Sequence, residues 1–595
     1  MFKIKLGGFF IAVLLIIPEI SFSSEDKPLD LETLVITKER QFLLNTYGTS
    51  LDQSKAFNYQ SSLENLSHLP VDLESRSLRS AIQTDFSLRG STFAQVLILL
   101  NGTRINDPQT AHHNSDIPFT KEDITDIEVI PGASSALFGA DAIGGAINFK
   151  LAPPGEKKML LESAVGNNRN GYGLFSLSDK FKELGFRISL EDAQSEGFRY
   201  DTDFKKFTTS VSVSLDLPDG SWKNNFGYQE KEFGAYDFYT PGLGYPSWEK
   251  TRTYLINSAV TLNDDGFLIR PSFLWRRHFD KFALRRTAAS FNDHRSDIYT
   301  PSIYLQKEIN VLGNVGLGLE WSQERITSTN LGKHNREDSS IFLDDSVGIG
   351  QSLDLGFSLR LDNFSDFDRV YTGSASAKFK LTDRAVFNLG ISRSMRIPSF
   401  TELYYSDSTT IGNTDLACEK AWNYQAGFEY KQRGFSSGLV LFLRKERQMI
   451  DWVRPDTSQK WQAINFTRDN VFGIECSMHK EINSLLNLDV NYAYTDKSID
   501  NQGYLYKYGP NYARHLINTV FNFNLPFGAQ EIGFSYKKRP ERRGWLLMNA
   551  GLNYDLNKNL KVFLNSTNIL NVEYQDIAGI PQPGRYIEAG LRMEW

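Results

Sequence analysis

Cysteine is almost absent from this 595-residue chain, which carries only Cys418 and Cys476. Two cysteines are too few for a framework of several disulfides, so a disulfide-rich scaffold is excluded. Their spacing matches no cysteine-based metal motif. The pair therefore predicts either a single bridge or two free thiols.

Long hydrophobic runs are also missing. The longest, Leu6–Ile17, follows Lys3 and Lys5 and precedes Pro18, which is the layout of a secretory signal peptide over residues 1–23. This run is shorter than the roughly 20 residues that a helix needs to cross a bilayer, and no later run is longer. We therefore expect the mature chain to leave the cytoplasm without a helical membrane span.

The chain has no excess of positive charge, since its formal net charge at pH 7 is -6. This balance argues against binding to nucleic acid or another polyanion. The glycine-rich stretch Gly139–Gly145 lacks the Lys-Ser/Thr pair that a phosphate-binding loop requires. No paired nucleophile and base and no serine elbow is evident, so we predict that the protein is not an enzyme.

What the sequence does contain, from residue 151 to 595, is a repeated strand-and-turn rhythm. Ser210–Leu215 alternates serine with aliphatic residues, and Ile587–Trp595 places apolar side chains on one face and mostly charged ones on the other. Such alternation predicts a transmembrane β-barrel, whose polar lumen-facing positions account for the negative mean hydropathy. About 20 residues per strand and connection would give about 22 antiparallel strands.

The part before the barrel contains motifs of a compact, tightly turned domain. Ile127–Phe149 reads as a strand, a glycine-rich turn and a second strand, and the apolar Val96–Leu100 reads as a strand inside a small sheet. Together with Phe86–Gly90, Arg396–Tyr404 and Asn565–Asn571, these segments resemble TonB-dependent outer-membrane receptors. The resemblance implies an all-β transmembrane barrel (151–595) with an N-terminal α+β plug domain (45–150) in its lumen.

The same resemblance implies where the protein works and with what. It predicts a monomer in the lipid of the outer membrane of a Gram-negative-type bacterium, a small-molecule nutrient as ligand and TonB as the energising partner. Residues 24–44 would hold a linker and a TonB box, a short strand suited to capture by another protein's sheet edge. Its alternative reading is a first plug strand. The box comprises Leu31, Glu32, Thr33, Leu34, Val35, Ile36 and Thr37.

One cluster, His112-His113-Asn114-Ser-Asp116, offers metal-ligand types. Adjacent histidines on a strand would point to opposite faces, and no glutamate completes a helical zinc motif, so no metal site is assigned there. A plain polar plug loop is one alternative. We favour another, in which His112, His113 and Asn114 contact substrate on the outward side of the plug.

Two further segments have the composition of extracellular loops. The segment 233–248 carries Tyr236, Tyr239, Tyr245 and Trp248 at irregular spacing, which favours a ligand-contacting loop over an aromatic girdle. The second segment has carboxylates at alternating positions, as a calcium site would, but lacks the glycine and distal glutamate of a dedicated calcium loop. A solvated loop is therefore favoured over calcium binding at Asp362, Asp366 and Asp368.

One difference between this sequence and the TonB-dependent receptors that it resembles predicts a contact between plug and barrel. Where many receptors pair two plug arginines with two barrel glutamates, this chain keeps Arg89 and Glu475 but has Pro131 and Gln425 at the other two places. Loss of one charge of each sign leaves a matched pair, as burial at an interface demands. We therefore predict an Arg89–Glu475 ion pair, unless the alignment is shifted by a strand.

The substrate prediction is a corrinoid. The chain is short for the family, and Ile450–Arg454 with Trp461 and Asn465 resembles a segment of cobalamin-type receptors. The alternative is a ferric siderophore, for which the basic stretch Lys537–Arg543 could supply cations if it is not a solvated loop. A passive porin or surface-binding barrel is the alternative from another class, against which the TonB box argues.

Overall fold

The computed structural model describes residues 49–52, 60–76, 82–132, 135–310, 312–499 and 503–595. The expected signal peptide (1–23) and the expected TonB box (Leu31–Thr37) lie outside these residues, as does the rest of the predicted linker 24–44. All elements described below belong to one compact unit.

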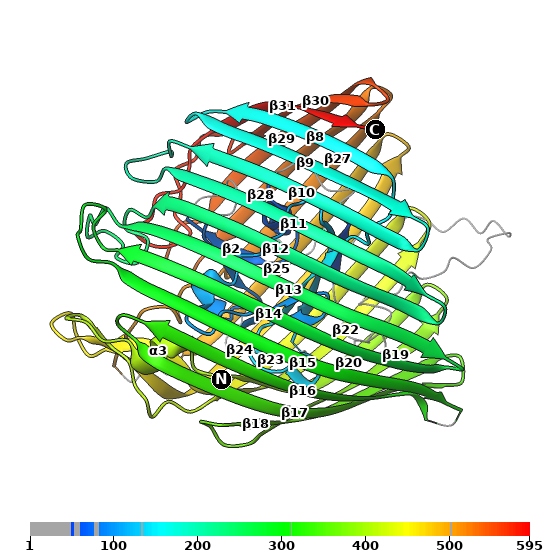
Figure 1. Ribbon diagram of the computed structural model, residues 1–595, viewed down its shortest axis with the longest axis horizontal. Helices are drawn as coiled ribbons and strands as arrows, with labels where there is room; N and C mark the ends of the chain where they lie inside the picture. The colour runs from blue at the N-terminus through cyan, green and yellow to red at the C-terminus, as the bar shows by residue number, and fades with distance from the viewer. Residues whose placement is uncertain (1–48, 53–59, 77–81, 133–134, 311, 500–502) are drawn as a thin grey trace, which may run out of the picture. The chain divides into compact units, whose positions relative to one another are not determined.

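The larger part of this unit is a closed antiparallel barrel of 22 strands, which confirms the predicted fold (Figure 1). Each strand pairs with its neighbour in sequence, and the last closes the barrel on the first in register from Glu588↔Gly166 to Glu594↔Leu160. The barrel strands are β8 (Lys158–Gly166), β9 (Asn170–Phe181), β10 (Leu184–Ser195), β11 (Phe204–Leu217), β12 (Gly220–Gly234), β13 (Trp248–Asp264), β14 (Phe267–Ala283), β15 (Asn292–Ile309), β16 (Gly313–Ser328), β17 (Gly332–Ile349), β18 (Leu353–Phe364), β19 (Val370–Thr382), β20 (Ala385–Arg396), β22 (Glu419–Gln432), β23 (Phe435–Arg454), β24 (Trp461–Asn483), β25 (Leu486–Ile499), β27 (His515–Leu525), β28 (Gly528–Lys538), β29 (Trp545–Asn557), β30 (Leu560–Thr567) and β31 (Tyr586–Glu594).

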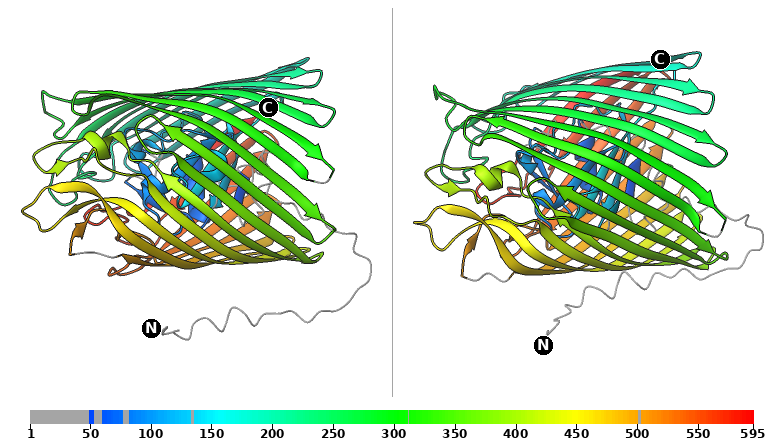
Figure 2. Two further views of the ribbon diagram at one scale, coloured as in Figure 1. Left: turned by 90° about the horizontal axis from the view of Figure 1, so that it is seen from below. Right: turned by 60° about the horizontal axis from the view of Figure 1, so that its bottom comes forward.

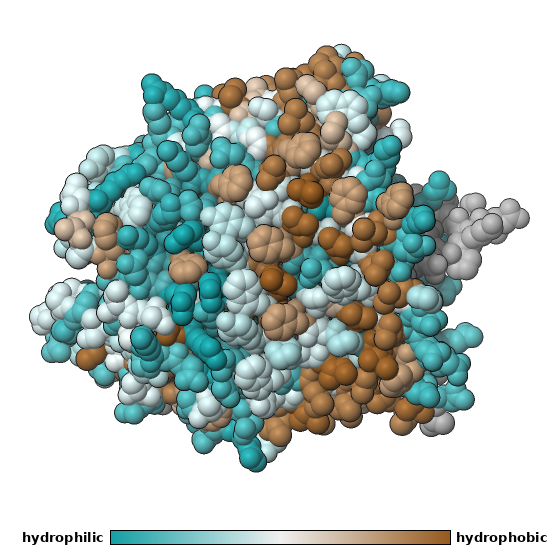
Figure 3. Space-filling view, in the orientation of Figure 1, coloured by the Kyte–Doolittle hydropathy of each residue, from teal (hydrophilic) through white to brown (hydrophobic). Residues whose placement is uncertain are grey.

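Side chains alternate between the lumen and the outside along these strands. In β31, Ile587 and Leu591 are exposed on the outer face whereas Glu588 is buried on the inner one, as the sequence predicts. The exposed aliphatic residues of neighbouring strands join into an apolar band with hydrophilic surface on both sides (Figure 3). This band is the surface that a bilayer would cover.

The two ends of the barrel differ in their connections. At one end the strands are joined by short turns such as 182–183 and 526–527. At the other, on the left in Figures 1 and 2, lie the long connections 235–247, 397–418 and 568–585. Because outer-membrane barrels have short periplasmic turns and longer extracellular loops, the long-loop end is the extracellular mouth. Two short strands, β21 (Thr410–Ile411) and β26 (Leu505–Tyr506), extend the wall there by pairing with β24 and β23.

The plug lies inside the barrel, drawn in blue in Figures 1 and 2. Its main sheet has the order β1-β6-β7-β4-β5, and β2 and β3 form a separate hairpin. The plug strands are β1 (Thr49–Asp52), β2 (Asp72–Ser75), β3 (Thr84–Ser87), β4 (Val96–Leu100), β5 (Thr103–Arg104), β6 (Ile124–Pro131) and β7 (Gly145–Leu151). As predicted, β4 lies inside the sheet, and all five of its side chains are fully buried.

The segment Ile127–Phe149 forms two strands of this sheet, β6 and β7, which are antiparallel neighbours. At the start of β7, Gly145 has a φ of +138°, and a Cβ there would lie 2.4 Å from the carbonyl oxygen of Ile130. Only glycine fits so close to the neighbouring backbone. This explains why a glycine-rich turn joins the two strands.

Helices are few and short in the described residues. They are α1 (Ser62–Asn65), α2 (Ser135–Phe138) and α3 (Phe400–Tyr404), with 3-10 turns η1 (Leu66–His68), η3 (Phe93–Gln95) and η4 (Ala111–His113). None of these described helices has the length and apolar character needed to cross a bilayer.

Candidate functional site

Arg89 joins the plug to the barrel wall. It has a left-handed backbone conformation (φ 52°) in the turn after β3. Its guanidinium donates two hydrogen bonds to Glu475 on β24, from Nε at 3.0 Å and from Nη2 at 2.7 Å, and a third from Nη1 to Gln425 at 3.0 Å. The ring of Phe442 lies 4.5 Å from the guanidinium carbon. Gln425 therefore accepts a hydrogen bond from Nη1, the guanidinium nitrogen that does not contact Glu475, and it adds no charge to the site.

A second charged contact involves the basic stretch Lys537–Arg543. Lys537 and Arg539 are buried, and both pair with plug Asp72 at 2.9 Å. Burial alone would raise the pKa of Asp72, but the charges of Arg539 and Lys537 outweigh it and lower that pKa to about 2. These two cations are therefore plug contacts and not part of a basic surface at the mouth.

Glu74 lies beside this contact and behaves in the opposite way. It is 3.3 Å from Arg539 and accepts a hydrogen bond from Asn511 at 2.7 Å. Burial is the largest influence on its pKa, and although Arg539 opposes it, that pKa rises to about 8. Asp72 is thus charged and Glu74 largely protonated at neutral pH.

The side of the plug nearest the mouth carries a small cluster of rings. His112 in η4 stacks on Phe93 with ring centroids 4.2 Å apart, and Tyr239 and Tyr508 meet it edge-on at 5.8 and 6.1 Å. Tyr239 comes from the loop 235–247, and Tyr508 comes from the connection 507–514 between β26 and β27. Phe93 and Tyr508 were not predicted from the sequence, because each lies in a segment with no motif and is brought here by the fold.

A hydrogen bond to Asp85 holds the ring of His112 in place. Its Nδ1 lies 3.0 Å from both carboxylate oxygens of Asp85, which also accepts from Arg76 at 2.9 Å. Burial lowers the pKa of His112, only partly offset by Asp85, so the ring is neutral at pH 7. Although burial raises the pKa of Asp85, His112 and Arg76 together lower it to about 2. The ring cluster therefore presents an uncharged surface.

The other rings proposed for substrate lie apart from this cluster. Tyr236 packs on Tyr200 and Arg199, Tyr245 lies against Arg285, and Trp248 packs on Phe291. Tyr239 is thus the one of the four predicted aromatic contacts that the structure brings to His112.

His113 and Asn114 turn away from the ring cluster. Asn114 accepts a hydrogen bond from the amide of Asp107, and His113 lies 3.4 Å from Asp280 on β14. Both side chains are buried. Burial lowers the pKa of His113, but hydrogen bonding to Asp280 and the charge of that carboxylate outweigh this effect and raise the pKa to about 9.

The three carboxylates considered for calcium have different partners. Asp362 lies within β18, where it is buried and accepts from Arg360 at 2.7 Å, and Asp366 pairs with Arg336 at 3.1 Å. Asp368 is exposed in the loop that follows. Arginines thus already neutralise two of the three, and the three do not form a common group of ligand atoms. Cys418 and Cys476 are free thiols, which answers the question of a disulfide.

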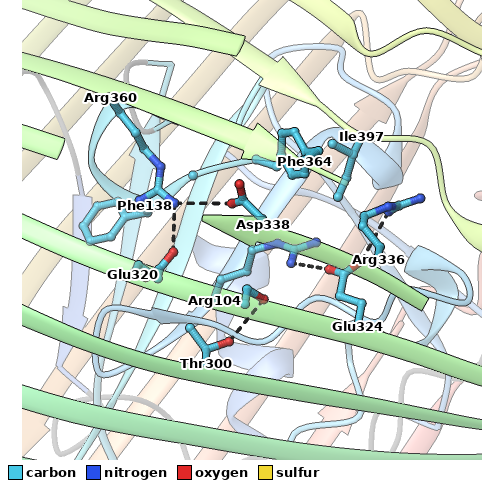
Figure 4. A pocket seen from close by; sticks show the side chains of 13 residues that line it. Arg104, Phe138, Thr300, Glu320, Glu324, Arg336, Asp338, Arg360, Phe364 and Ile397 are labelled. Atoms are coloured by element: carbon cyan, nitrogen blue, oxygen red, sulfur yellow. Dashed lines mark hydrogen bonds and ion pairs between the residues drawn. The ribbon is translucent and has the colours of Figure 1, made fainter. Parts of the chain in front are cut away.

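A small cavity lies between the plug and strands β15–β18 (Figure 4). Plug Arg104 donates to Glu324 at 2.7 Å, and Glu324 also accepts from Arg336 at 3.2 Å. Arg360 donates to Glu320 at 2.8 Å. This part of the boundary between plug and barrel therefore combines paired charges with apolar side chains such as Phe138, Phe364 and Ile397.

A larger, open cavity lies at the mouth end between the plug and the seam where the barrel closes. Its walls carry amide and hydroxyl groups, two carboxylates (Glu64 and Asp576) and several rings, including those of Phe198, Phe204, Trp545, Tyr574 and Tyr586. The one cation among the described residues that line it is Lys537, which pairs with Asp576 at 2.7 Å. This arrangement suits a large, uncharged or amphipathic ligand.

Comparison with known proteins identifies the family. Residues 160–569 match the family model "TonB dependent receptor-like, beta-barrel", and residues 48–146 match the "TonB-dependent Receptor Plug Domain". The chain is 24% identical over 603 residues to the vitamin B12 transporter BtuB of Photobacterium profundum, covering 94% of this chain and 95% of that protein.

Solved structures of similar fold include two receptors from Pseudomonas aeruginosa. The siderophore receptor PirA superposes with a TM-score of 0.75 at 16% identity, covering 92% of this chain and 99% of that one. A mutant of the ferric enterobactin receptor PfeA in complex with enterobactin gives 0.77 at 15% identity and the same coverage. The barrel model alone matches more than half of this sequence. The chain therefore belongs to the TonB-dependent receptor family, and it is a plugged receptor of the Gram-negative outer membrane that transports and does not catalyse.

Proposed function

We propose that this receptor imports cobalamin or a related corrinoid, and that TonB drives release by pulling on the segment Leu31–Thr37. The observation that carries the substrate class is the near-full-length similarity to a vitamin B12 transporter. The similarity to siderophore receptors, at 13–16% identity, reflects the shared fold alone.

The chemistry of the large cavity supports a corrinoid over a ferric catecholate. A ferric catecholate is anionic and calls for several available cations. Among the described residues lining this cavity the one cation, Lys537, is already paired, and Arg539 beside it is held by Asp72. A corrinoid is large and amphipathic, and it can lie on aromatic walls with amide and hydroxyl partners.

The segment that resembles cobalamin-type receptors has a supporting role. Asp451 accepts hydrogen bonds from the backbone amides of Tyr508 and Gly509, at distances between 2.7 and 3.2 Å. Arg454 lies 4.2 Å above the ring of Trp461. This segment thus holds the loop that supplies Tyr508 to the ring cluster.

Equilibrium binding to the purified protein tests the substrate class. We expect cyanocobalamin to bind, and we expect Trp545→Ala, in the cavity wall, to weaken binding about tenfold, because one ring contact is lost. Leu243→Ala, in an exposed part of the loop 235–247, is the control and should bind like wild type. A panel of ferric siderophores, with and without calcium, completes the test. Siderophore binding with no corrinoid affinity under either condition would overturn the proposal.

A passive porin is the competing function from another class. A diffusion pore would gain nothing from a folded domain in its lumen that is held by buried ion pairs such as Arg89–Glu475. The plug therefore favours a gated, energised importer over a pore.

A further inference from the structure

A group of histidines and carboxylates lies buried between the plug and strands β13 and β14, close to the mouth end. The members are His113 and Asp116 from the plug, Glu249 from β13, and His278 and Asp280 from β14. All five are at most 5% exposed. The function proposed above uses none of them.

Three of these residues converge as metal ligands do. One potential ligand atom each of His113, Asp116 and His278 lies within 4.8 Å of the other two. The rings of His113 and His278 are 4.5 Å apart, and His278 Nδ1 is 3.9 Å from Asp116 Oδ2. Tetrahedral bonds of about 2.0–2.1 Å place ligand atoms about 3.4 Å apart, so side-chain shifts of about 1 Å would complete the set.

Buried side-chain atoms with no hydrogen-bond partner among the described residues lie at this group of three residues. Within the described residues, Asp116 Oδ2 and His278 Nε2 have no hydrogen-bond partner, although the side chains are 2% and 0% exposed. Asp116 Oδ1 is taken by Lys231, which leaves Oδ2 toward His278. Buried polar atoms without partners are costly, and a bound ion would satisfy them.

The balance of charge around these three residues also favours a bound cation. Four buried carboxylates, Asp107, Asp116, Glu249 and Asp280, face two lasting cations, because Arg276 pairs with Asp107 and Lys231 with Asp116. A divalent cation bound among these carboxylates would offset part of the remaining negative charge.

The neighbours of the triad hold its rings in place. Thr253 Oγ1 lies 2.9 Å from His278 Nδ1, which leaves Nε2, the nitrogen without a hydrogen-bond partner in the described part of the chain, as the ligand atom of that ring. Asp280 lies 3.4 Å from His113. Such second-layer contacts orient imidazoles for metal binding. Glu249 is already engaged by the hydroxyl of Tyr239 at 2.6 Å, and Asp280 by Gln109 at 2.8 Å, so these two are better suited to support than to bind.

We propose that His113, Asp116 and His278 bind one divalent transition-metal ion of the Zn²⁺ class. Two imidazoles and one carboxylate select a borderline cation rather than calcium, and water would supply the fourth ligand. The ion ties the plug segment 111–116 to β14, so it adds a contact between plug and wall that does not depend on the transported ligand.

Metal titration of tag-free, chelator-treated protein tests the site, with Co²⁺ as the visible probe and Zn²⁺ as competitor. We expect one equivalent of Co²⁺ per chain, a tetrahedral absorption band that Zn²⁺ abolishes, and more than about 100-fold weaker binding in His278→Asn and Asp116→Asn. His479→Asn is the matched control. That histidine pairs with Asp489 and lies outside the group, so its variant should bind like wild type.

Folding of each variant is checked by the resistance of the barrel to detergent without heating. The proposal is overturned if the folded wild type binds no stoichiometric Co²⁺, or if His278→Asn and Asp116→Asn bind as wild type does. It is equally overturned if Glu249→Gln removes binding while His278→Asn keeps it, because the triad would then not be the ligand set.

Discussion

The interior of the plug and its boundary with the barrel differ in how many buried charges they hold. The strand Val96–Leu100 and its neighbours in the sheet bury aliphatic side chains almost completely. At the boundary the buried side chains include charged pairs such as Arg89–Glu475, Asp72–Arg539 and Arg104–Glu324.

The two kinds of contact therefore have different roles: one keeps the plug folded, and the other fixes the position of the plug in the barrel, which we call its seating. Burial of apolar surface is non-directional and strong, so it keeps the plug folded as a unit. Buried ion pairs add little net stability because desolvation offsets their attraction, but breaking one partner is costly, so they fix position. A plug built in this way stays folded in one orientation and can still be moved by a pull along the chain.

The largest expected effect is on the plug interior. Ile98→Asp puts an unpaired charge at a fully buried position, which should cost more than about 5 kcal/mol and unfold the plug. Limited proteolysis should then cut the plug while the barrel keeps its resistance to detergent. Leu243→Asp, at a position 69% exposed, is the control and should leave the plug intact. A protected plug in Ile98→Asp would show that its fold does not rest on this core.

A smaller effect is expected at the boundary. Arg89→Ala or Glu475→Ala should each destabilise plug seating by about 3–5 kcal/mol, because the partner is left buried and charged. The double variant should cost less than the sum of the two. Gln425→Ala removes one hydrogen bond and should cost only about 1 kcal/mol.

Hydrogen exchange of the β4 amides against denaturant measures these free energies. Strictly additive costs for Arg89→Ala and Glu475→Ala would mean that the two groups do not act as a pair.

A further effect is a dependence of plug stability on pH through Glu74. Its pKa is raised from the ordinary 4.5 to about 8, chiefly by burial, so the seated plug holds this proton more tightly than the unfolded plug does. The resulting stabilisation is complete below about pH 4.5 and is lost as the pH rises through about 8. Hydrogen exchange should therefore show wild-type plug protection falling between about pH 4.5 and pH 8, while the protection of Glu74→Gln, which cannot ionise, falls less. An equal fall in both proteins would exclude Glu74 as the cause.

The contacts that could be predicted from the sequence are those that leave a local or periodic mark. The alternation of apolar and polar residues along Ile587–Trp595 predicted a barrel strand, and the apolar run Val96–Leu100 predicted the inner strand of the plug sheet. Arg89 and Glu475 were found because each lies in a motif of its own, and the structure places them 2.7 Å apart.

What could not be predicted depends on partners distant in sequence. His113 was considered on a strand, where its neighbour would point away, but it lies in the 3-10 turn η4 and meets His278 and Asp280 on the wall. The basic stretch around Arg539 gave no sign that Asp72 would bury it, because the two residues are separated by most of the chain. Side-chain clusters between plug and barrel depend on how the two domains dock, which no local pattern records.

The most direct test of the account is deletion of Leu31–Thr37, the segment through which we propose that TonB acts. Cells that carry the deletion should display a folded receptor that binds cyanocobalamin as wild type does, but they should accumulate none of it beyond a strain without the receptor. The matched control replaces the same residues by a Gly/Ser linker of equal length, which should fail in the same way because it cannot pair with a sheet edge. Accumulation at the wild-type rate in the deletion strain would contradict energised import.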